Sequence, residues 1–390
     1  MHLSRIEEKM LSGEYGEVVE KAIRVVVKVG EALGAERLVE ISHAHVSGIS
    51  YFNIGDEGLE LLEDLSNKGA KVGVYTTANP YSFAGLALYK DKELVEKQVR
   101  IIGSLLKIGV DPNSFTCTPY KLRKPLTGEH LAWAESSAVI YANSVLGART
   151  NREGGLVALM SALIGRTYYA GMHSMENRKA SEVIVALFDV DSILVASLFG
   201  LYIGGVSHSI PYIRARYSAE NELLLDIMLR SMLASIATTS DIPMAVLESV
   251  TPQHTYIIEK GETISVDIRE LENMNIKCYS DTLLLGCPHI TLHELEALLR
   301  DRHLDLLQKY GISKVIVTVP KYDEKHYDVI SRLIQKARER YSIEVQILPG
   351  ACAVVSNLKL LGFTTIATPH GKALHYLQNL AGVKPCTIHV

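Results

Sequence analysis

Three of the five cysteines lie in settings where thiols often do chemistry. Cys117, Cys287 and Cys352 each follow a short apolar run typical of a β-strand. Each also has a turn former beside it: Thr-Pro after Cys117, Pro288 after Cys287, and Gly350 just before Cys352. In parallel sheets the carboxyl ends of the strands share one edge, where ligands bind. The three thiols are therefore expected to converge at such an edge.

Three thiolates are one ligand short of a closed structural zinc site, or of a four-iron cluster held only by protein. An iron left open in this way acts as a Lewis acid and helps a hydroxy acid lose its hydroxyl group without redox chemistry. The spacing alone leaves alternatives open, because the chain has no Cys-x-x-Cys pair. The thiols also fit buried bystanders, a structural zinc site, or, for Cys287 beside His289, a cysteine nucleophile.

The other two cysteines have no comparable setting. Cys278 precedes the strand that leads to Cys287 and lies about 30 Å from it if the chain between them is extended. Cys386, in the segment KPCTIHV, is expected to be structural or free. An odd, scattered set in a long chain is unlike the disulfide framework of a secreted protein, so free thiols are predicted.

Polar side chains are also concentrated between Phe115 and Arg152, among apolar runs such as SAVIYANSVLGA. Such runs imply burial, and a buried polar group left unpaired costs about 1 to 3 kcal/mol. These side chains are therefore expected to bond one another or a ligand: Glu135, Ser136, Ser137, Asn143, Ser144 and Arg149.

The elements that must position these residues follow a repeated pattern, in which a short apolar run stops at a polar turn. The runs and their turns are RLVEIS before HAHVSGISYFNIG, KVGVYTT before ANPYSF, SF before TCTPY, LLLG before CPH, VIVTV before PKYD, VQIL before PGAC, and TTIA before TPHGK. Helical patterns lie between several of them: two within residues 1–37, one over 56–68, and one from the capping box Thr291/Glu294 to Gly311. This alternation predicts an α/β fold with mostly parallel sheets.

A chain of 390 residues exceeds one typical domain. We expect an α/β domain over 1–180 with the central motif, a smaller lobe over 181–280, and an α/β domain over 281–390 with Cys287 and Cys352. The apolar run Ser192 to Val206 is shorter than the roughly 20 residues of a membrane span, so a buried helix is predicted there.

Charge and composition exclude some partners. The 40 basic and 44 acidic residues give a net charge of -4, and no basic block points to nucleic acid or to an anionic membrane surface. The charged N-terminal region lacks the features of a signal peptide, which predicts a cytoplasmic protein. This composition agrees better with a small polar substrate than with nucleic acid or a membrane surface.

A set of motifs along nearly the whole chain resembles the aconitase X family. They are SHAHVSGISYFNIGDEGLELLEDL, VYTTANP, TCTPY, GEHLAWAESSAVIYANSVLGARTNREGG, MENR, GCPHITLHEL and PGACAVVSNLKLLGFTTIAT. The resemblance implies an aconitase-like fold of several domains with the site at the strand carboxyl ends between them. It also implies an iron–sulfur hydro-lyase of isoprenoid biosynthesis, which removes water from (R)-5-phosphomevalonate to give trans-anhydromevalonate 5-phosphate.

The resemblance places Cys117, Cys287 and Cys352 at the cluster-binding positions, with a [4Fe-4S] cluster that leaves one iron open. The missing Cys-x-x-Cys departs from classical aconitases and leaves three-iron and two-iron forms open. In the wider superfamily a serine on a separate swivelling domain takes the substrate proton. The resemblance therefore implies a heterodimer with a small subunit that supplies the base. Another hydroxy acid, such as cis-3-hydroxyproline, and a non-catalytic metal-holding subunit are the alternatives.

A phosphorylated hydroxy acid requires backbone amides, hydroxyls and a cation around its anionic groups. Turns with these groups give the predicted substrate-binding residues Ser47, Gly48, Ile49, Ser50, Asn79, Pro80, Ser136, Ser137, Gly371 and Lys372. The predicted catalytic residues are His43, His45 and Glu135. The two histidines are two residues apart after a strand, so in an extended segment they share a face and could donate to a departing hydroxide.

Overall fold

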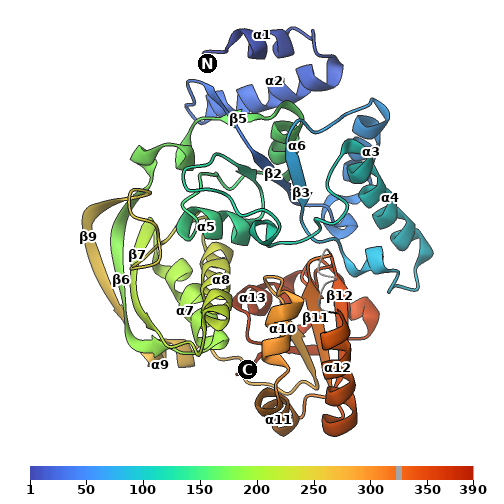
Figure 1. The fold of residues 1–390 in the computed structure, drawn as a ribbon, viewed down its shortest axis with the longest axis vertical. Helices are drawn as coiled ribbons and strands as arrows, with labels where there is room; N and C mark the ends of the chain where they lie inside the picture. Colours follow the sequence, from blue (N-terminus) through green and yellow to red (C-terminus); the bar gives the residue numbers. More distant parts are fainter. Residues whose placement is uncertain (322–326, 390) are drawn as a thin grey trace.

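The computed structural model describes residues 1–321 and 327–389, which contain four β-sheets (Figure 1). All strand pairs in the three larger sheets are parallel, and the single antiparallel pair joins β1 to β5. Helices lie between the strands along the chain. The predicted α/β fold with mostly parallel sheets is confirmed.

The first part of the chain, at the top of Figure 1, places β2 at the centre of its sheet between β3 and β4. Its strands are β1 (Leu38–Glu40), β2 (His43–Val46), β3 (Tyr75–Ala78), β4 (Ala132–Trp133) and β5 (Arg166–Tyr168). Its α-helices are α1 (Arg5–Leu11), α2 (Glu17–Ala32), α3 (Tyr51–Asn67), α4 (Lys92–Ile108), α5 (Ser136–Ser144) and α6 (Gly155–Ile164). α1 and α2 confirm the two predicted N-terminal helices.

The middle part, at the lower left of Figure 1, holds a sheet in the order β8-β7-β6-β9 with α7 and α8 packed together beside it. Its elements are β6 (Lys179–Val190), α7 (Ile193–Val206), β7 (Ile210–Tyr217), α8 (Glu222–Thr239), β8 (Val246–Leu247), β9 (Ile257–Val266) and α9 (Ile268–Glu272). α7 is the helix predicted from the long apolar run, and it is buried as expected. Within the described residues, no helix has the length and apolar composition that a bilayer crossing requires.

The last part, at the lower right of Figure 1, is a five-stranded parallel sheet with β10 at its centre, in the order β12-β11-β10-β13-β14. Its strands are β10 (Thr282–Leu285), β11 (Lys314–Val319), β12 (Glu344–Pro349), β13 (Thr365–Thr368) and β14 (Lys384–Thr387). Its α-helices are α10 (Leu292–Leu298), α11 (Asp301–Lys309), α12 (Tyr327–Tyr341) and α13 (Gly371–Asn379). Each of the three larger sheets uses strands from one part of the chain. The predicted division at 180 and 280 stays a prediction.

Two predicted elements differ from the structure. The capping box at Thr291 and Glu294 is present, but the helix that follows it is broken into α10 and α11 rather than continuous to Gly311. The break at Arg300 lets both halves bury their leucines, and Leu299 and Leu304 are both 0% exposed. In addition, His43 and His45 lie within strand β2 itself, because the run RLVEIS ends early as β1.

One predicted turn, PKYD after β11, falls partly outside the described residues, since residues 322 and 323 are not described. Three other strand ends carry their polar turns as expected: β3 leads to Asn79, β10 to Cys287 and β12 to Cys352. These strand ends supply the candidate site. The expected strand before Cys117 is not formed, because Phe115 pairs with Ala78 only through an isolated bridge.

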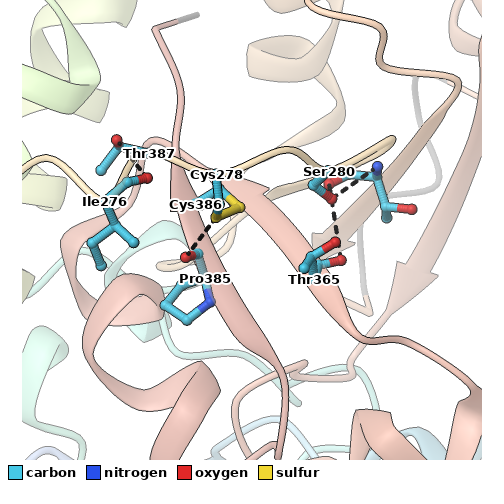
Figure 2. Close-up of a disulfide and its surroundings, with 8 residues drawn as sticks. Ile276, Cys278, Ser280, Thr365, Pro385, Cys386 and Thr387 are labelled. Atoms are coloured by element: carbon cyan, nitrogen blue, oxygen red, sulfur yellow. Dashed lines mark hydrogen bonds between the residues drawn. A yellow bond between two sulfur atoms is a disulfide. The ribbon is translucent and has the colours of Figure 1, made fainter.

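A disulfide joins Cys278 to Cys386, which corrects the prediction that both are free thiols (Figure 2). The two residues are 108 positions apart, but the segment before β10 runs beside β14, and their Cα atoms are 5.4 Å apart. The Thr387 amide donates to the Ile276 carbonyl at 3.0 Å, and the Thr387 hydroxyl donates to the same carbonyl at 3.3 Å (Figure 2), which holds the two segments side by side. The remaining three cysteines, Cys117, Cys287 and Cys352, are free.

Candidate active site at the three cysteine loops

Hydrogen bonds join the three loops that carry the free cysteines. The Cys352 amide donates to the Tyr81 carbonyl at 3.0 Å, so the turn after β3 holds the loop after β12. The His289 amide donates to Cys117 Sγ at 3.2 Å, which brings in the loop of Cys287 after β10. Loops from the first and last parts of the chain thus meet at one place.

The three thiols are close enough to influence one another electrostatically. Burial raises the pKa of each thiol, and the charge of Cys352 raises the pKa of Cys117 and of Cys287 further. The Lys372 ammonium acts on all three thiols in the opposite direction. Cys287 is buried, whereas Cys117 and Cys352 are partly exposed, so the group is open on one side.

The donor set is chemically compatible with an iron–sulfur cluster, which thiolates bind. Within the described residues, no three His, Cys, Asp or Glu side chains are placed to hold one metal ion. A cluster does not require such a tight group, because each cysteine binds a different iron of the cluster. Three free, neighbouring thiols with a cation beside them match that requirement.

Lys372 and Glu135 form a buried ion pair next to the thiols. Lys372 Nζ contacts Glu135 Oε1 and donates to Ser136 Oγ at 3.1 Å and to Ser137 Oγ at 2.8 Å. Glu135 also caps the N-terminus of α5, where its Oε2 accepts from the Ala138 amide at 2.7 Å. The predicted bonding of Glu135, Ser136 and Ser137 is therefore met by a lysine more than 200 residues away in the sequence.

Both members of this pair are charged at neutral pH. Burial alone would raise the pKa of Glu135, but Lys372 and the Ala138 amide hold it below its usual value. Burial alone would lower the pKa of Lys372, but Glu135 and the Cys287 thiol hold it above its usual value. The N-terminal ends of α5 and α13 add positive potential at the same place.

The turn from Ser47 to Ser50 borders the loop of Cys352. Ser50 Oγ donates to the Val355 carbonyl at 2.8 Å, and Ser47 Oγ donates to the Ala134 carbonyl at 3.4 Å. Gly48 is exposed and has a φ of +69°, a conformation that favours glycine. Ile49 is buried at 2% exposure, and its backbone carbonyl accepts from the Gln98 side-chain amide at 3.0 Å.

His43 and His45 form a hydrogen-bonded chain with Thr77 and Asn79. His45 Nε2 donates to Asn79 Oδ1 at 2.9 Å, so its Nδ1 accepts from the Thr77 hydroxyl at 2.7 Å. The Thr77 oxygen then accepts from His43 Nε2 at 2.9 Å, which leaves His43 Nδ1 buried without a partner. Both rings are 0% exposed, and burial lowers the pKa of His45 to about 4 and that of His43 well below its usual value.

Two other predicted substrate-binding residues have packing roles in the structure. A Cβ added to Gly371 would lie 2.3 Å from Ser235 Oγ, because the start of α13 is pressed against α8. Pro80 is buried in the turn between β3 and Tyr81, whose amide donates to the Gly350 carbonyl at 3.1 Å. Their contact with substrate stays a prediction.

Comparison with known proteins decides the family. Models of the aconitase X first, second and third domains match residues 1–176, 182–275 and 280–389. The chain belongs to the aconitase X family. The crystal structure of the holo-form of Thermococcus kodakaraensis aconitase X matches with a TM-score of 0.85 and 35% identity, covering 98% of this chain and 96% of that one. Family and fold were both predicted from the motifs.

Curated relatives give the class of reaction. The phosphomevalonate dehydratase large subunit of Thermococcus kodakarensis is 37% identical over 390 residues, covering 97% of this chain and 95% of the relative. The cis-3-hydroxy-L-proline dehydratase of Pseudomonas aeruginosa is 34% identical over 262 residues, covering 64% of this chain and 43% of the relative. Both names denote dehydratases, so this aconitase X chain is a hydro-lyase.

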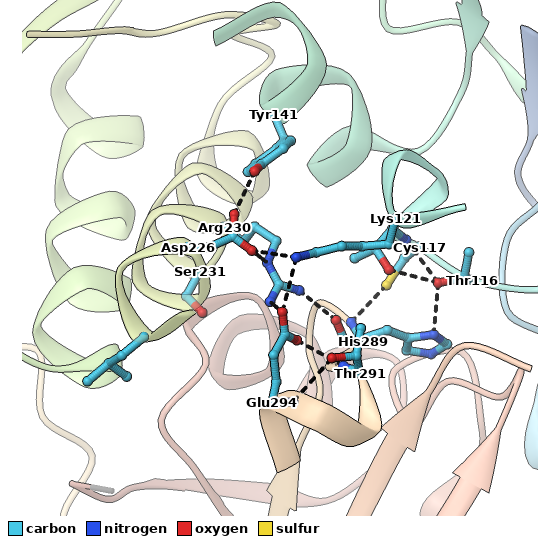
Figure 3. A network of polar contacts seen from close by, with 12 residues as sticks. Thr116, Cys117, Lys121, Tyr141, Asp226, Arg230, Ser231, His289, Thr291 and Glu294 are labelled. Carbon is cyan, nitrogen blue, oxygen red and sulfur yellow. Dashed lines mark hydrogen bonds and ion pairs between the residues drawn. The ribbon is translucent and has the colours of Figure 1, made fainter. Parts of the chain in front are cut away.

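The aconitase X site also contains charged residues that the sequence reasoning missed (Figure 3). Arg230 on α8 pairs with Glu294 at 2.6 Å and with Asp226 at 3.1 Å, and Lys121 pairs with both carboxylates. Arg230 also donates to the His289 carbonyl at 2.8 Å. The sequence did contain a signal for this ion pair: in the apolar helix DIMLRSMLASIA, Asp226 and Arg230 are four residues apart and therefore share one helix face.

Proposed function

We propose that this chain is the catalytic large subunit of a phosphomevalonate dehydratase. It removes water from (R)-5-phosphomevalonate to give trans-anhydromevalonate 5-phosphate, as a step of an archaeal mevalonate pathway. The observation that carries the proposal is the meeting of Cys117, Cys287 and Cys352 beside the Lys372–Glu135 pair. A relative that is named phosphomevalonate dehydratase large subunit is 37% identical, and the match covers 95% of its length.

Cys117, Cys287 and Cys352 are proposed to hold a [4Fe-4S] cluster with one iron open. When bound, such a cluster supplies a Lewis acid that makes hydroxide a better leaving group. Cys117 and Cys352 are partly exposed, so the substrate is expected to approach from their side.

The residues of this chain are proposed to bind the anionic groups of the substrate. Lys372 is beside the thiols, so it meets the carboxylate next to the reacting carbons, together with the Ser136 and Ser137 hydroxyls. Glu135 keeps Lys372 charged and in place. The phosphate is assigned to the turn of Ser47, Gly48, Ile49 and Ser50, and Asn79 with Pro80 borders the same space.

His43 and His45 are proposed to orient Asn79 rather than to exchange a proton with the substrate. Both rings are buried and neutral, and the chain from His43 through Thr77 to His45 ends on Asn79 Oδ1. That contact uses the Asn79 amide oxygen and leaves its N–H groups to donate to substrate. The base that takes the proton is assigned to a small partner subunit, in a cytoplasmic heterodimer; the curated relative is named a large subunit.

The test is anaerobic co-expression with the small subunit, iron and sulfide analysis, and a dehydration assay on (R)-5-phosphomevalonate. Replacing Cys117, Cys287 or Cys352 by Ser is expected to abolish cluster uptake and lower kcat by at least about 10²-fold, as expected when a main transition-state stabiliser is lost. Cys278→Ser is the control for loss of a cysteine outside the site; circular dichroism must show that it is folded, because it also removes the disulfide to Cys386, and it is expected to keep the cluster. A colourless protein that contains zinc contradicts the proposal, as does activity that depends on Cys287 alone.

A second candidate substrate is cis-3-hydroxy-L-proline, the substrate named for the relative that matches 64% of this chain. The two substrates differ in charge, since only phosphomevalonate carries a phosphate. Replacing the partly exposed Ser47 by Ala should raise the KM for phosphomevalonate by about 10-fold or more, since one lost hydrogen bond to a charged group is worth about 1.5 to 3 kcal/mol. Turnover of cis-3-hydroxy-L-proline with no turnover of phosphomevalonate would favour the second candidate.

A further inference from the structure

His289 touches all three cysteine loops at once. It follows Cys287 by two residues, its amide donates to Cys117 Sγ at 3.2 Å, and its ring Nε2 lies 2.9 Å from the carbonyl of Ala351, the residue before Cys352. Its ring Nδ1 lies 3.2 Å from Thr116 Oγ1, next to Cys117. Figure 3 shows the amide and ring contacts with the Cys117 loop.

The partners determine where the ring proton lies. A carbonyl oxygen only accepts hydrogen bonds, so the contact with Ala351 requires the proton on Nε2. Nδ1 is then an acceptor, and the Thr116 hydroxyl donates to it. The Thr116 oxygen in turn accepts from the Thr118 amide at 3.1 Å. Both ring nitrogens are thus used to join the loop of Cys287 to the other two cysteine loops.

The backbone of His289 is held from a third side. Arg230 donates to its carbonyl at 2.8 Å, and the Arg230 side chain, 1% exposed, is paired with Glu294 and Asp226. Arg230 comes from α8 in the middle part of the chain, so the histidine is fixed by residues from all three parts. Such support reduces the movement of the loop before any cofactor is present.

We propose that His289 is the positioning residue that sets the mutual placement of Cys117, Cys287 and Cys352 and so prepares the site for its cluster. This inference rests on the proposed function. Because ligands that are already placed bind metal more tightly, and lost outer-sphere contacts typically cost 10- to 100-fold in metal affinity, the effect is expected on cluster retention before catalysis.

Three variants separate positioning from general stability. His289→Ala removes both ring contacts, whereas His289→Gln keeps a side-chain N–H that can reach the Ala351 carbonyl and should restore part of the effect. His173→Ala is the control, because His173 is also 0% exposed and bonded through its ring, to His130 at 2.9 Å. Far-UV circular dichroism and urea unfolding check that each variant is folded.

The first readout is cluster retention after anaerobic reconstitution. Iron loss to a chelator, followed by visible absorption, is expected to be about 10- to 100-fold faster in His289→Ala than in the wild type. His289→Gln should fall between the two, and His173→Ala should match the wild type. Equal rates in wild type and His289→Ala, when both carry a cluster, would overturn the proposal.

The second readout needs no cluster. In the metal-free chain with the Cys278–Cys386 disulfide intact, the rates at which a maleimide labels Cys117 and Cys352 should rise several-fold in His289→Ala and be partly restored in His289→Gln. If the wild-type chain takes up no cluster, the proposed function fails, and labelling alone decides on His289. Unchanged labelling in both His289 variants would then overturn its positioning role.

Discussion

Lys372 shows how a single charged residue is kept in a buried place. Its side chain is 15% exposed, and without Glu135 burial would favour the neutral amine. The Glu135 carboxylate and the Ser136 and Ser137 hydroxyls instead hold a full ammonium group beside three thiols. If the three thiols hold the proposed cluster, the ammonium group of Lys372 would offset part of the negative charge of the thiolate ligands.

Glu153 gives a prediction at the same scale. Its side chain is buried, its Oε1 has no partner, and its Oε2 accepts from the Tyr168 hydroxyl at 2.7 Å. Burial raises the pKa of Glu153 from 4.5 in the unfolded chain to about 7. Between these pH values the unfolded chain releases this proton while the folded chain retains it, so this group lowers the free energy of unfolding as pH rises.

The expected loss from Glu153 between pH 4.5 and pH 7 is about 3 kcal/mol, from about 1.4 kcal/mol per pKa unit. Glu153→Gln cannot lose a proton and should not show this part of the decline. Urea unfolding at pH 5 and pH 8 measures the free energy of unfolding of both proteins. From pH 5 to pH 8 this free energy should fall less in the variant than in the wild type. Parallel pH curves for the two proteins would contradict the assignment.

At the scale of elements, the start of α13 places Lys372 and depends on Gly371. A Cβ at Gly371 would lie 2.3 Å from Ser235 Oγ and 2.9 Å from the Ser197 carbonyl, so Gly371→Ala should push α13 away from α7 and α8. The expected cost is about 1 to 3 kcal/mol in the free energy of unfolding, with weaker cluster uptake. Gly205→Ala in α7 is the control, because nothing lies within 4 Å of its Cβ, and it should be neutral or stabilising. Equal stability of the two variants would contradict this.

The disulfide gives a second prediction for elements. It closes a loop of 108 residues, for which the chain-entropy model predicts a stabilisation of about 4 to 5 kcal/mol. Cys386→Ser should therefore lower the midpoint of urea unfolding, and adding a reductant to the wild type should have the same effect. Cys278→Ser should match Cys386→Ser, and the double variant should lose nothing further. A reductant with no effect on the wild type would show that the bond does not form in solution.

At the scale of the whole molecule, the three parts of the chain share their cores. One apolar cluster contains Ile140 from the first part, Leu229 from the middle part and Leu283 from the last part. A second combines Ile101 and Phe115 of the first part with Ala351 of the last. The candidate site lies where these parts meet, so its geometry depends on their joint folding.

Arg230 tests this dependence. It joins the middle part to Glu294 and His289 of the last part and, through Asp226, to Lys121 of the first. Arg230→Met leaves Glu294 and Asp226 with Lys121 as their one shared basic partner among the described residues, and should lower the free energy of unfolding by up to about 3 to 5 kcal/mol. Arg216→Met is the control: the Arg216–Asp189 pair is exposed, so its loss should leave the free energy of unfolding nearly unchanged. Chemical unfolding followed by circular dichroism measures both, and similar losses would contradict a linking role for Arg230.

The sequence by itself determined what depends on neighbouring residues. Apolar runs followed by polar turns predicted strands with Cys287 and Cys352 at their ends, the long apolar run predicted α7, and the motifs predicted the family. Only the tertiary structure decided which distant groups meet. Lys372 reaches Glu135 across 237 positions, His289 reaches Cys117 across 172, and Cys278 reaches Cys386 across 108. Local patterns determine which face of an element is buried. Which residue packs against that face depends on how distant elements pack, and the neighbouring residues in the sequence carry no signal of that partner.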